Sequence, residues 1–118
     1  MGTRCLTVLY DTKYPDAEAE EIAVLYRQMD GYPDGHGAEL TEFLENMVVV
    51  NGINMAETRR IANGGSFLAA QIVAHFKTDA GRFYLYPAGT RGAGEEYIYY
   101  VRPQEDGTIL VETEEVSD

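Results

Sequence analysis

The densest group of chemically useful side chains lies in a glycine-rich stretch in the first half of the chain. The stretch Asp30 to Gly37 reads DGYPDGHG and supplies two carboxylates, a phenol and an imidazole. Its glycines and proline predict tight turns rather than regular structure. Exposed main-chain N–H groups before a helix suit a polar or anionic ligand, although a plain strand-to-helix connection has the same composition. The candidate ligand-binding residues here are Arg27, Asp30, Tyr32, Asp34 and His36.

A second candidate site is the sequence Asn63-Gly64-Gly65-Ser66, which precedes an apolar helix. Two glycines followed by a hydroxyl at a helix start can form an anion-binding nest. Arginines just upstream would add bidentate phosphate contacts. An ordinary helix start with Ser66 as its N-cap is the alternative. The candidates are Arg59, Arg60, Gly64, Gly65 and Ser66.

Two polar side chains interrupt the apolar segment Phe67 to Lys77, which is predicted to be a buried helix. Gln71 and His75 are four residues apart and share one helix face. Both are candidate ligand contacts, but a histidine in such a helix is more often a hydrogen-bonded core residue. No metal site is expected, because His36 and His75 are the only histidines and there is one cysteine.

Tyrosines on two predicted strands form the fourth candidate, represented by Tyr84, Tyr86 and Tyr99. Strand alternation places Tyr84 and Tyr86 on one face, and Tyr97 and Tyr99 on one face of a later strand. Tyrosine rings suit nucleobases or a protein partner. Cross-strand pairing inside a half-buried sheet explains them equally well.

Catalytic constellations are poor in this sequence. Ser66 lacks the Gly-x-Ser-x-Gly context of a nucleophile elbow, and Cys5 lies in a predicted strand, where a free cysteine is usually a small core residue. We therefore assign no catalytic residue and expect no cofactor.

Alternating apolar residues predict the strands. In the second of them Ile22, Val24 and Tyr26 are expected to face one way. The predicted strands are Arg4 to Tyr10, Ile22 to Arg27, Arg82 to Tyr86, Tyr97 to Arg102 and Thr108 to Thr113.

A helix is predicted from Ala38 to a stop at Asn51-Gly52, because apolar residues recur at helical spacing. These residues are Leu40, Phe43, Leu44, Met47 and Val48. A short helix is predicted over Met55 to Ala62, and turns over Asp79 to Gly81 and Gln104 to Gly107.

The order strand, strand, helix, helix, strand, strand, strand predicts an α+β fold. We expect a single domain over residues 1–118, with an antiparallel sheet of about five strands and helices packed on one face. The acidic segment from about 113 to 118 is expected to be frayed.

Composition limits the classes of function. The chain has 118 residues, 45% of them apolar, and a formal charge of −11. This charge argues against general nucleic-acid binding, because phosphate affinity comes from basic residues. No segment is apolar enough for a membrane span or a signal peptide, so we expect a cytoplasmic protein without membrane contact. Residues 105–118 hold six acids and no base, so the acidity is concentrated at the edges and favours solubility.

The segment from Leu25 to Gly37, LYRQMDGYPDGHG, resembles the signature of a family of small uncharacterised proteins from bacteria, archaea, prophages and tailed phages. The segments Leu68 to Lys77, Phe83 to Tyr86 and Glu96 to Tyr99 are similar to later parts of the same family. The resemblance implies no activity, but it implies a phage-associated context in which small proteins counter host defence.

Two functions follow as hypotheses. The first is a binding protein that sequesters a nucleotide-type signal. In it, tyrosines would stack on the base and arginines would contact the phosphate. The alternative is an acidic, anti-CRISPR-like inhibitor that binds a host nuclease or another defence complex; a small enzyme is third. The partner would be a small molecule or a host protein in the host cytoplasm. Homo-oligomers are expected, because tyrosine-rich strands leave half-apolar surface.

Overall fold

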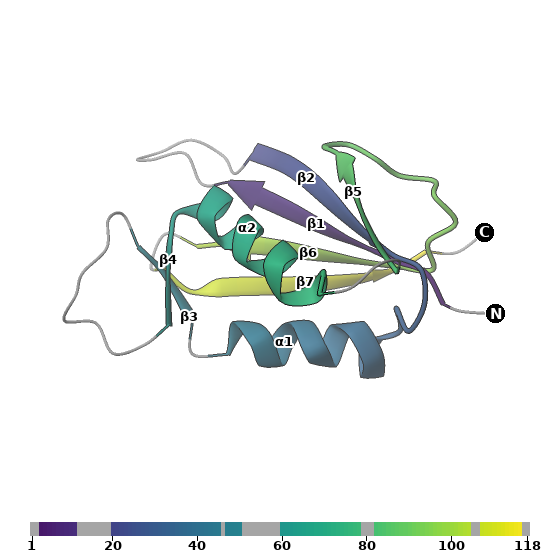
Figure 1. Ribbon diagram of the computed structural model, residues 1–118, viewed down its shortest axis with the longest axis horizontal. Helices are drawn as coiled ribbons and strands as arrows, with labels where there is room; N and C mark the ends of the chain where they lie inside the picture. Colours follow the sequence, from purple (N-terminus) through teal and green to yellow (C-terminus); the bar gives the residue numbers. More distant parts are fainter. Residues whose placement is uncertain are drawn as a thin grey trace.

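A five-stranded sheet with helices on one face forms the body of the protein (Figure 1). The computed structural model describes residues 3–11, 20–45, 47–50, 60–78, 82–104 and 107–116. The strands of the sheet, in the spatial order β5-β2-β1-β6-β7, are β1 (Cys5–Asp11), β2 (Glu20–Arg27), β5 (Phe83–Pro87), β6 (Tyr97–Pro103) and β7 (Ile109–Glu115). The predicted α+β class is confirmed.

The sheet is mixed, which corrects the expectation of purely antiparallel pairing. Strands β1 and β6 run parallel, with Cys5 aligned to Tyr97, whereas the other neighbours are antiparallel. Since β5 also runs parallel to β1, the connection from β5 to β6 has to return along the sheet instead of making a tight hairpin. The glycine-rich segment 88–96 makes this return.

One face of the sheet packs against both helices, α1 (Ala38–Leu44) and α2 (Gly65–Phe76). Leu40 from α1 and Ile72 from α2 are fully buried against this face. Helix α2 is buried along one side only, because Phe67 is 41% exposed. The predicted buried helix is therefore present, but it buries one side rather than its whole surface.

The opposite face has its own apolar cluster, formed by Leu6, Val8, Val24, Tyr26 and Ile98. Rings of tyrosines and the segment 88–96, through Ala93, pack over it. This face is therefore covered by its own aromatic side chains and a loop rather than by a helix.

A β-bulge in the β1–β2 pair corrects one predicted strand face. The register shifts between Leu9 and Tyr10. As a result Ile22 packs on the helix face, while Val24 and Tyr26 lie on the opposite face as predicted. An extra residue in one strand reverses the side-chain alternation beyond it.

The first helix ends earlier than predicted. Helix α1 stops at Leu44, and Met47–Val50 forms strand β3, which pairs in parallel with β4 (Arg60–Asn63) in a separate two-stranded sheet. Three consecutive valines favour a strand, although the preceding apolar spacing is helical.

The end of the predicted short helix, Arg60 to Ala62, is also strand. The start of this predicted short helix lies outside the described residues. The same is true of the predicted helix stop at Asn51-Gly52, the predicted turn Asp79 to Gly81 and two residues of the predicted turn 104–107.

The acidic end of the chain is more ordered than expected. Strand β7 continues to Glu115, which aligns with Tyr97 of β6, so the prediction of fraying from residue 113 is wrong for Thr113 to Glu115. Within the described residues, no helix is long and apolar enough to cross a membrane.

Candidate functional site

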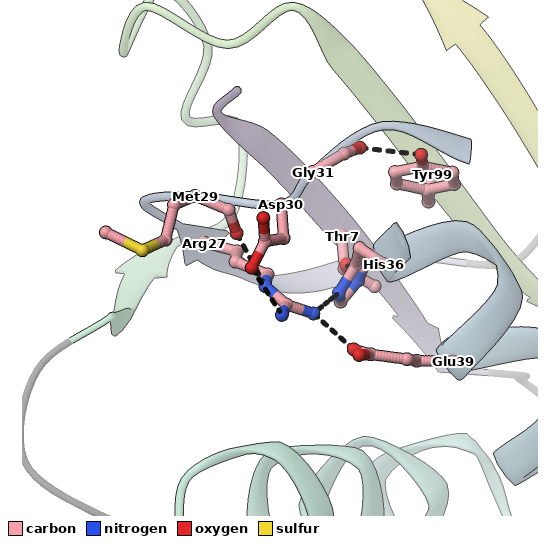
Figure 2. A network of polar contacts seen from close by, with 8 residues as sticks. All are labelled: Thr7, Arg27, Met29, Asp30, Gly31, His36, Glu39 and Tyr99. Carbon is pink, nitrogen blue, oxygen red and sulfur yellow. Dashed lines mark hydrogen bonds and ion pairs between the residues drawn. The ribbon is translucent and has the colours of Figure 1, made fainter. Parts of the chain in front are cut away.

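Arg27, at the end of β2, is the centre of a polar network beneath the glycine-rich stretch (Figure 2). Its Nε donates to the Met29 carbonyl at 2.7 Å, and its Nη1 donates to Glu39 and lies 3.2 Å from His36 Nδ1. Asp30 Oδ2 lies 3.9 Å from Nη2. The arginine is only 6% exposed, so these partners replace the water that its charge has lost.

His36 is fully buried and has a defined tautomer. A guanidinium can only donate, so His36 Nδ1 accepts from Arg27, and Nε2 must carry the proton that it donates to Thr7 Oγ1 at 2.7 Å. Burial first, and then the charge of Arg27, lower the His36 pKa to about 3. The neutral ring packs against Phe76 and Tyr99, with centroid distances of 4.8 and 5.3 Å.

The backbone of the glycine-rich stretch turns this histidine inward. Pro33–Gly37 forms a single π-helical turn, η1, so the prediction of turns without regular structure is wrong there. Asp30 has a left-handed φ of 63°, and its carbonyl accepts the His36 N–H at 2.8 Å. A Cβ on Gly35 would lie 2.5 Å from the same carbonyl oxygen. Glycine at this position therefore permits the close approach.

The stretch is also anchored to the sheet on both sides. Tyr99 of β6 donates its hydroxyl to the Gly31 carbonyl at 2.7 Å, and the Gly31 N–H donates to the Thr3 carbonyl. A Cβ on Gly31 would lie 2.7 Å from Cys5 Cβ. Burial raises the pKa of Cys5 to about 12 and the pKa of Tyr99 above its usual range, so both groups stay protonated at neutral pH. The stretch is thus a rigid part of the fold.

A cavity of about 780 Å³ lies at the end of the sheet where β1 and β6 begin and β2 and β7 end. We call it the sheet-end cavity. Tyr32 and Met29, which are 42% and 39% exposed, border it from the glycine-rich stretch. Its lining residues are Thr3, Arg4, Gln28, Met29, Tyr32, Gly94, Glu95, Glu96, Tyr97, Glu115 and Val116.

The ionisable lining of this cavity is mostly acidic. Among the described lining residues, Arg4 is the single cation, against three glutamates. Glu95 already accepts from the N–H groups of Gly92 and Ala93, at 3.0 and 2.6 Å. Glu96, Glu115, Gln28 and Thr3 are further side-chain acceptors and donors in the lining. Tyr32 and Tyr97 supply flat apolar surface and a hydroxyl each.

A smaller cavity, of about 370 Å³, opens at the outer end of the Arg27 network. Arg27, Glu39, His75 and Arg82 contribute its polar lining. Arg82 and Asp30 are the two non-glycine residues with a positive φ in the described part of the chain. The predicted candidates Arg27 and His75 therefore border one space, although the ring of His75 stacks on Phe43 at 4.1 Å.

The second predicted site, before α2, is not an open anion nest. The Ser66 N–H donates to Asp11 Oδ1 at 3.1 Å, so a carboxylate of the same chain occupies this amide. The N-cap position belongs to Gly64, with a φ of 86°, and α2 has no side-chain cap bond there. The prediction that Ser66 is the N-cap is therefore wrong. Gly65 permits tight packing, since a Cβ would lie 2.5 Å from the Tyr10 carbonyl.

The remaining predicted residues are dispersed. Tyr84 and Tyr86 pack on Tyr26 on the face opposite the helices, with centroid distances of 5.8 and 5.7 Å. Tyr99 is buried on the helix face. Asp34 is exposed on η1, and Gln71 is half-buried on α2. Arg59 and the side chain of Arg60 lie outside the described residues.

The sequence patterns did not predict Thr7 and Glu39 in the network, or Arg4, Gln28 and Glu96 in the cavity. Thr7 could have been noticed, because it is a polar residue inside an otherwise apolar strand. Glu39 has the signal of an acid in the first turn of a helix. The cavity residues carry no local signal, because four chain segments bring them together.

No protein-family model, curated protein or solved structure matches the chain.

Proposed function

We propose that the protein is a non-catalytic binding protein whose small-molecule ligand occupies the sheet-end cavity. The observation that carries the proposal is the cavity itself, because its volume lies within the range of roughly 300–1,000 Å³ that is usual for ligand sites. Its walls are held in place. The stretch that presents Tyr32 is anchored through Gly31 to Thr3 and Tyr99.

The lining favours a ligand with a planar ring and few negative charges. Tyr32 and Tyr97 offer stacking surface, and Gln28 and Glu96 offer donors and acceptors for the edge of a nucleobase. Arg4 can contact one phosphate, but three glutamates oppose further phosphates. A nucleotide-type ligand with a single phosphate fits this set better than a di- or triphosphate.

The buried imidazole supports binding rather than acid–base catalysis. His36 is fully buried, and both of its ring nitrogens are already engaged, by Arg27 and Thr7. A general base must reach the proton that it abstracts. With the phage-associated context implied by the resemblance, we propose that the protein sequesters a nucleotide signal of host defence.

The test is thermal stability measured with cyclic and linear mononucleotides, di- and triphosphates, and nucleosides. A ligand at about 100 times its Kd stabilises a one-site protein by about 2.7 kcal/mol. The variants Tyr32→Ala and Arg4→Ala should lose this shift. The control Tyr84→Ala should keep it, because Tyr84 is 44% exposed and is not among the residues that line the cavity. Absence of a shift with every member of the panel would contradict the proposal.

An acidic inhibitor remains a second candidate, favoured by one observation. The edge strand β7 exposes Glu112, Glu114 and Glu115. Two of these have partners in the same chain, since Glu112 pairs with Arg102 and Glu114 accepts from the Tyr100 hydroxyl. A purified host nuclease that binds the protein, and that is released by Glu112→Gln with Glu115→Gln but not by Tyr32→Ala, would favour this function over sequestration.

A further inference from the structure

Strand β5 forms one edge of the main sheet and, within the described residues, pairs only with β2. Its sequence, FYLYP, contains no charged residue. Leu85, at 60%, is the most exposed large apolar side chain among the described residues. Leu110 follows at 46% and Tyr84 at 44%. Edge strands of soluble proteins are usually protected by charges, bulges or covering segments. In the part of the chain that the structure describes, β5 has only Pro87 at its end.

The main-chain groups of the open edge can be assigned from the ladder. The Gln28 N–H donates to the Arg82 carbonyl at 2.8 Å, in register with the β2–β5 pairs that follow. Hydrogen-bonded pairs alternate in an antiparallel ladder, so Tyr84 and Tyr86 direct their main-chain groups toward β2. Phe83 and Leu85 therefore direct theirs toward the open edge.

We propose that β5 pairs antiparallel with β5 of a second copy of the chain, about a two-fold axis at Leu85. The sequence around this axis is itself symmetric, because Tyr84 and Tyr86 flank Leu85. An isologous contact requires such self-complementarity. In this register the N–H and carbonyl of Leu85 bond to those of its symmetry mate. The Phe83 N–H faces the Pro87 carbonyl, which already accepts from the Thr90 N–H and hydroxyl, and Pro87 has no N–H to donate in return. The Leu85 pair therefore carries the main-chain bonding of this contact.

The side chains match on both faces of the joined sheet. On one face Tyr84 of each copy lies beside Tyr86 of the other, which extends the cluster that these tyrosines form with Tyr26. On the other face the two Leu85 side chains lie directly opposite each other. Pairing therefore covers the apolar groups that the monomer exposes on this strand.

Charge disfavours a second copy at β7 more than at β5. Two chains of charge −11 repel each other, most strongly where acids are exposed, as on β7. At β5, Arg82 precedes the strand, and Glu21, which accepts the Gly89 N–H just beyond its end, is paired with Arg91. Neither end of β5 therefore carries the concentration of exposed acids that β7 has.

Sedimentation velocity over a dilution series tests this proposal. The wild-type chain should reach twice its mass of 13.1 kDa. Leu85→Lys should weaken dimerisation by about tenfold or more, because it places two like charges at the axis. Leu110→Lys, a matched change on the opposite edge, should leave the dimer intact.

A charge-swap experiment excludes misfolding as the cause. Leu85→Lys and Leu85→Glu should each be monomeric, and their mixture should form a dimer, because only the mixture pairs opposite charges at the axis. A monomeric wild type, a dimer that survives Leu85→Lys, or a mixture that stays monomeric would overturn the proposal.

Discussion

Two arginine–glutamate pairs use the same groups with different consequences. The pair around the buried Arg27 is called the buried pair, and the pair around the part-exposed Arg91 is called the surface pair. Arg27 pairs with Glu39 and lies over the Phe83 ring at 5.1 Å; Arg91 pairs with Glu21 and lies over the Tyr100 ring at 5.9 Å. The side chain of Arg27 is 7% exposed and that of Arg91 is 35% exposed. Removing Glu39 therefore leaves the charge of Arg27 without water, whereas solvent can replace Glu21 beside Arg91.

The pairs also differ in what depends on them. Arg27 ties β2 to Met29, His36 and α1, so its loss affects the glycine-rich stretch as a whole. Arg91 and the Gly89 N–H both bind Glu21, and so attach only the return segment 88–96 to β2. The buried pair therefore organises the fold, and the surface pair positions one loop.

The largest expected effect is that of Arg27→Met. It removes the donor for His36 and Glu39 and leaves the Met29 carbonyl without its side-chain partner. We expect a loss of about 2–4 kcal/mol in the free energy of unfolding, because His36 Nδ1 and the Met29 carbonyl lose their donor, whereas Glu39 is 52% exposed and regains water. The loss is measured by urea denaturation. Arg91→Met is the matched control, with an expected loss of about 1 kcal/mol or less. Equal losses in the two variants would remove the distinction between the pairs.

The next effect is that of His36→Phe, which keeps a ring among Phe76 and Tyr99 but removes both nitrogens. Thr7 and Arg27 each lose a hydrogen-bond partner, and we expect a loss of about 1–3 kcal/mol. His75→Phe, at an exposed position, should change stability by about 0.5 kcal/mol or less. Urea denaturation midpoints of the two variants provide the measurement, and a neutral His36→Phe would show that the network does not stabilise the fold.

Acidification should act on the buried network through His36. Its pKa is about 3 in the folded chain and near 6.5 when unfolded, so the unfolded chain binds more protons between these values. Stability is then fully present above pH 6.5 and falls as the pH drops toward 3, by up to about 1.4 kcal/mol per pH unit. Between pH 6.5 and 3, the free energy of unfolding should fall more steeply with decreasing pH for the wild type than for His36→Phe, as measured by unfolding curves at each pH. Identical slopes would mean that His36 does not carry this dependence.

The smallest effect is expected for Glu21→Gln at the surface. The Arg91 hydrogen bond, the largest of several causes, lowers the pKa of Glu21, but solvent screening limits the energy to about 0–1 kcal/mol. Added salt should reduce the difference from wild type further. Amide hydrogen exchange at Gly89 is the sensitive measurement, because this N–H loses a charged acceptor. Unchanged exchange would show that Glu21 does not hold the return segment.

Local patterns predicted the strands and the main helix, but not how strands pair over long distances. Alternation in β1 identifies its two faces, yet it does not encode whether β6 runs parallel or antiparallel beside it. The spacing of Met47 and Val48 continues a helical stripe, and only their β-branched neighbours indicate strand β3. The bulge beside Tyr10 has no sequence signal of its own.

The candidate site was predicted in part. Arg27, Asp30 and His36 lie together as predicted. However, His36 and the Arg27 guanidinium are hydrogen-bonded inside the fold instead of being available to a ligand. Composition cannot distinguish these cases, because the direction of a loop side chain depends on the backbone. Here that backbone depends on the close approach of Gly35 to Asp30.

The parallel pairing of β1 and β6 also has a consequence for how the chain reaches its folded state. Strand β1 is made first and lies at the centre of the sheet, but its alignment of Cys5 with Tyr97 requires almost the whole chain. Such non-local pairing gives a high contact order and slow folding. During synthesis the β1–β2 hairpin can form early, while the other edge of β1 stays open until β6 emerges. The last third of the chain therefore determines when the centre of the sheet is protected from aggregation.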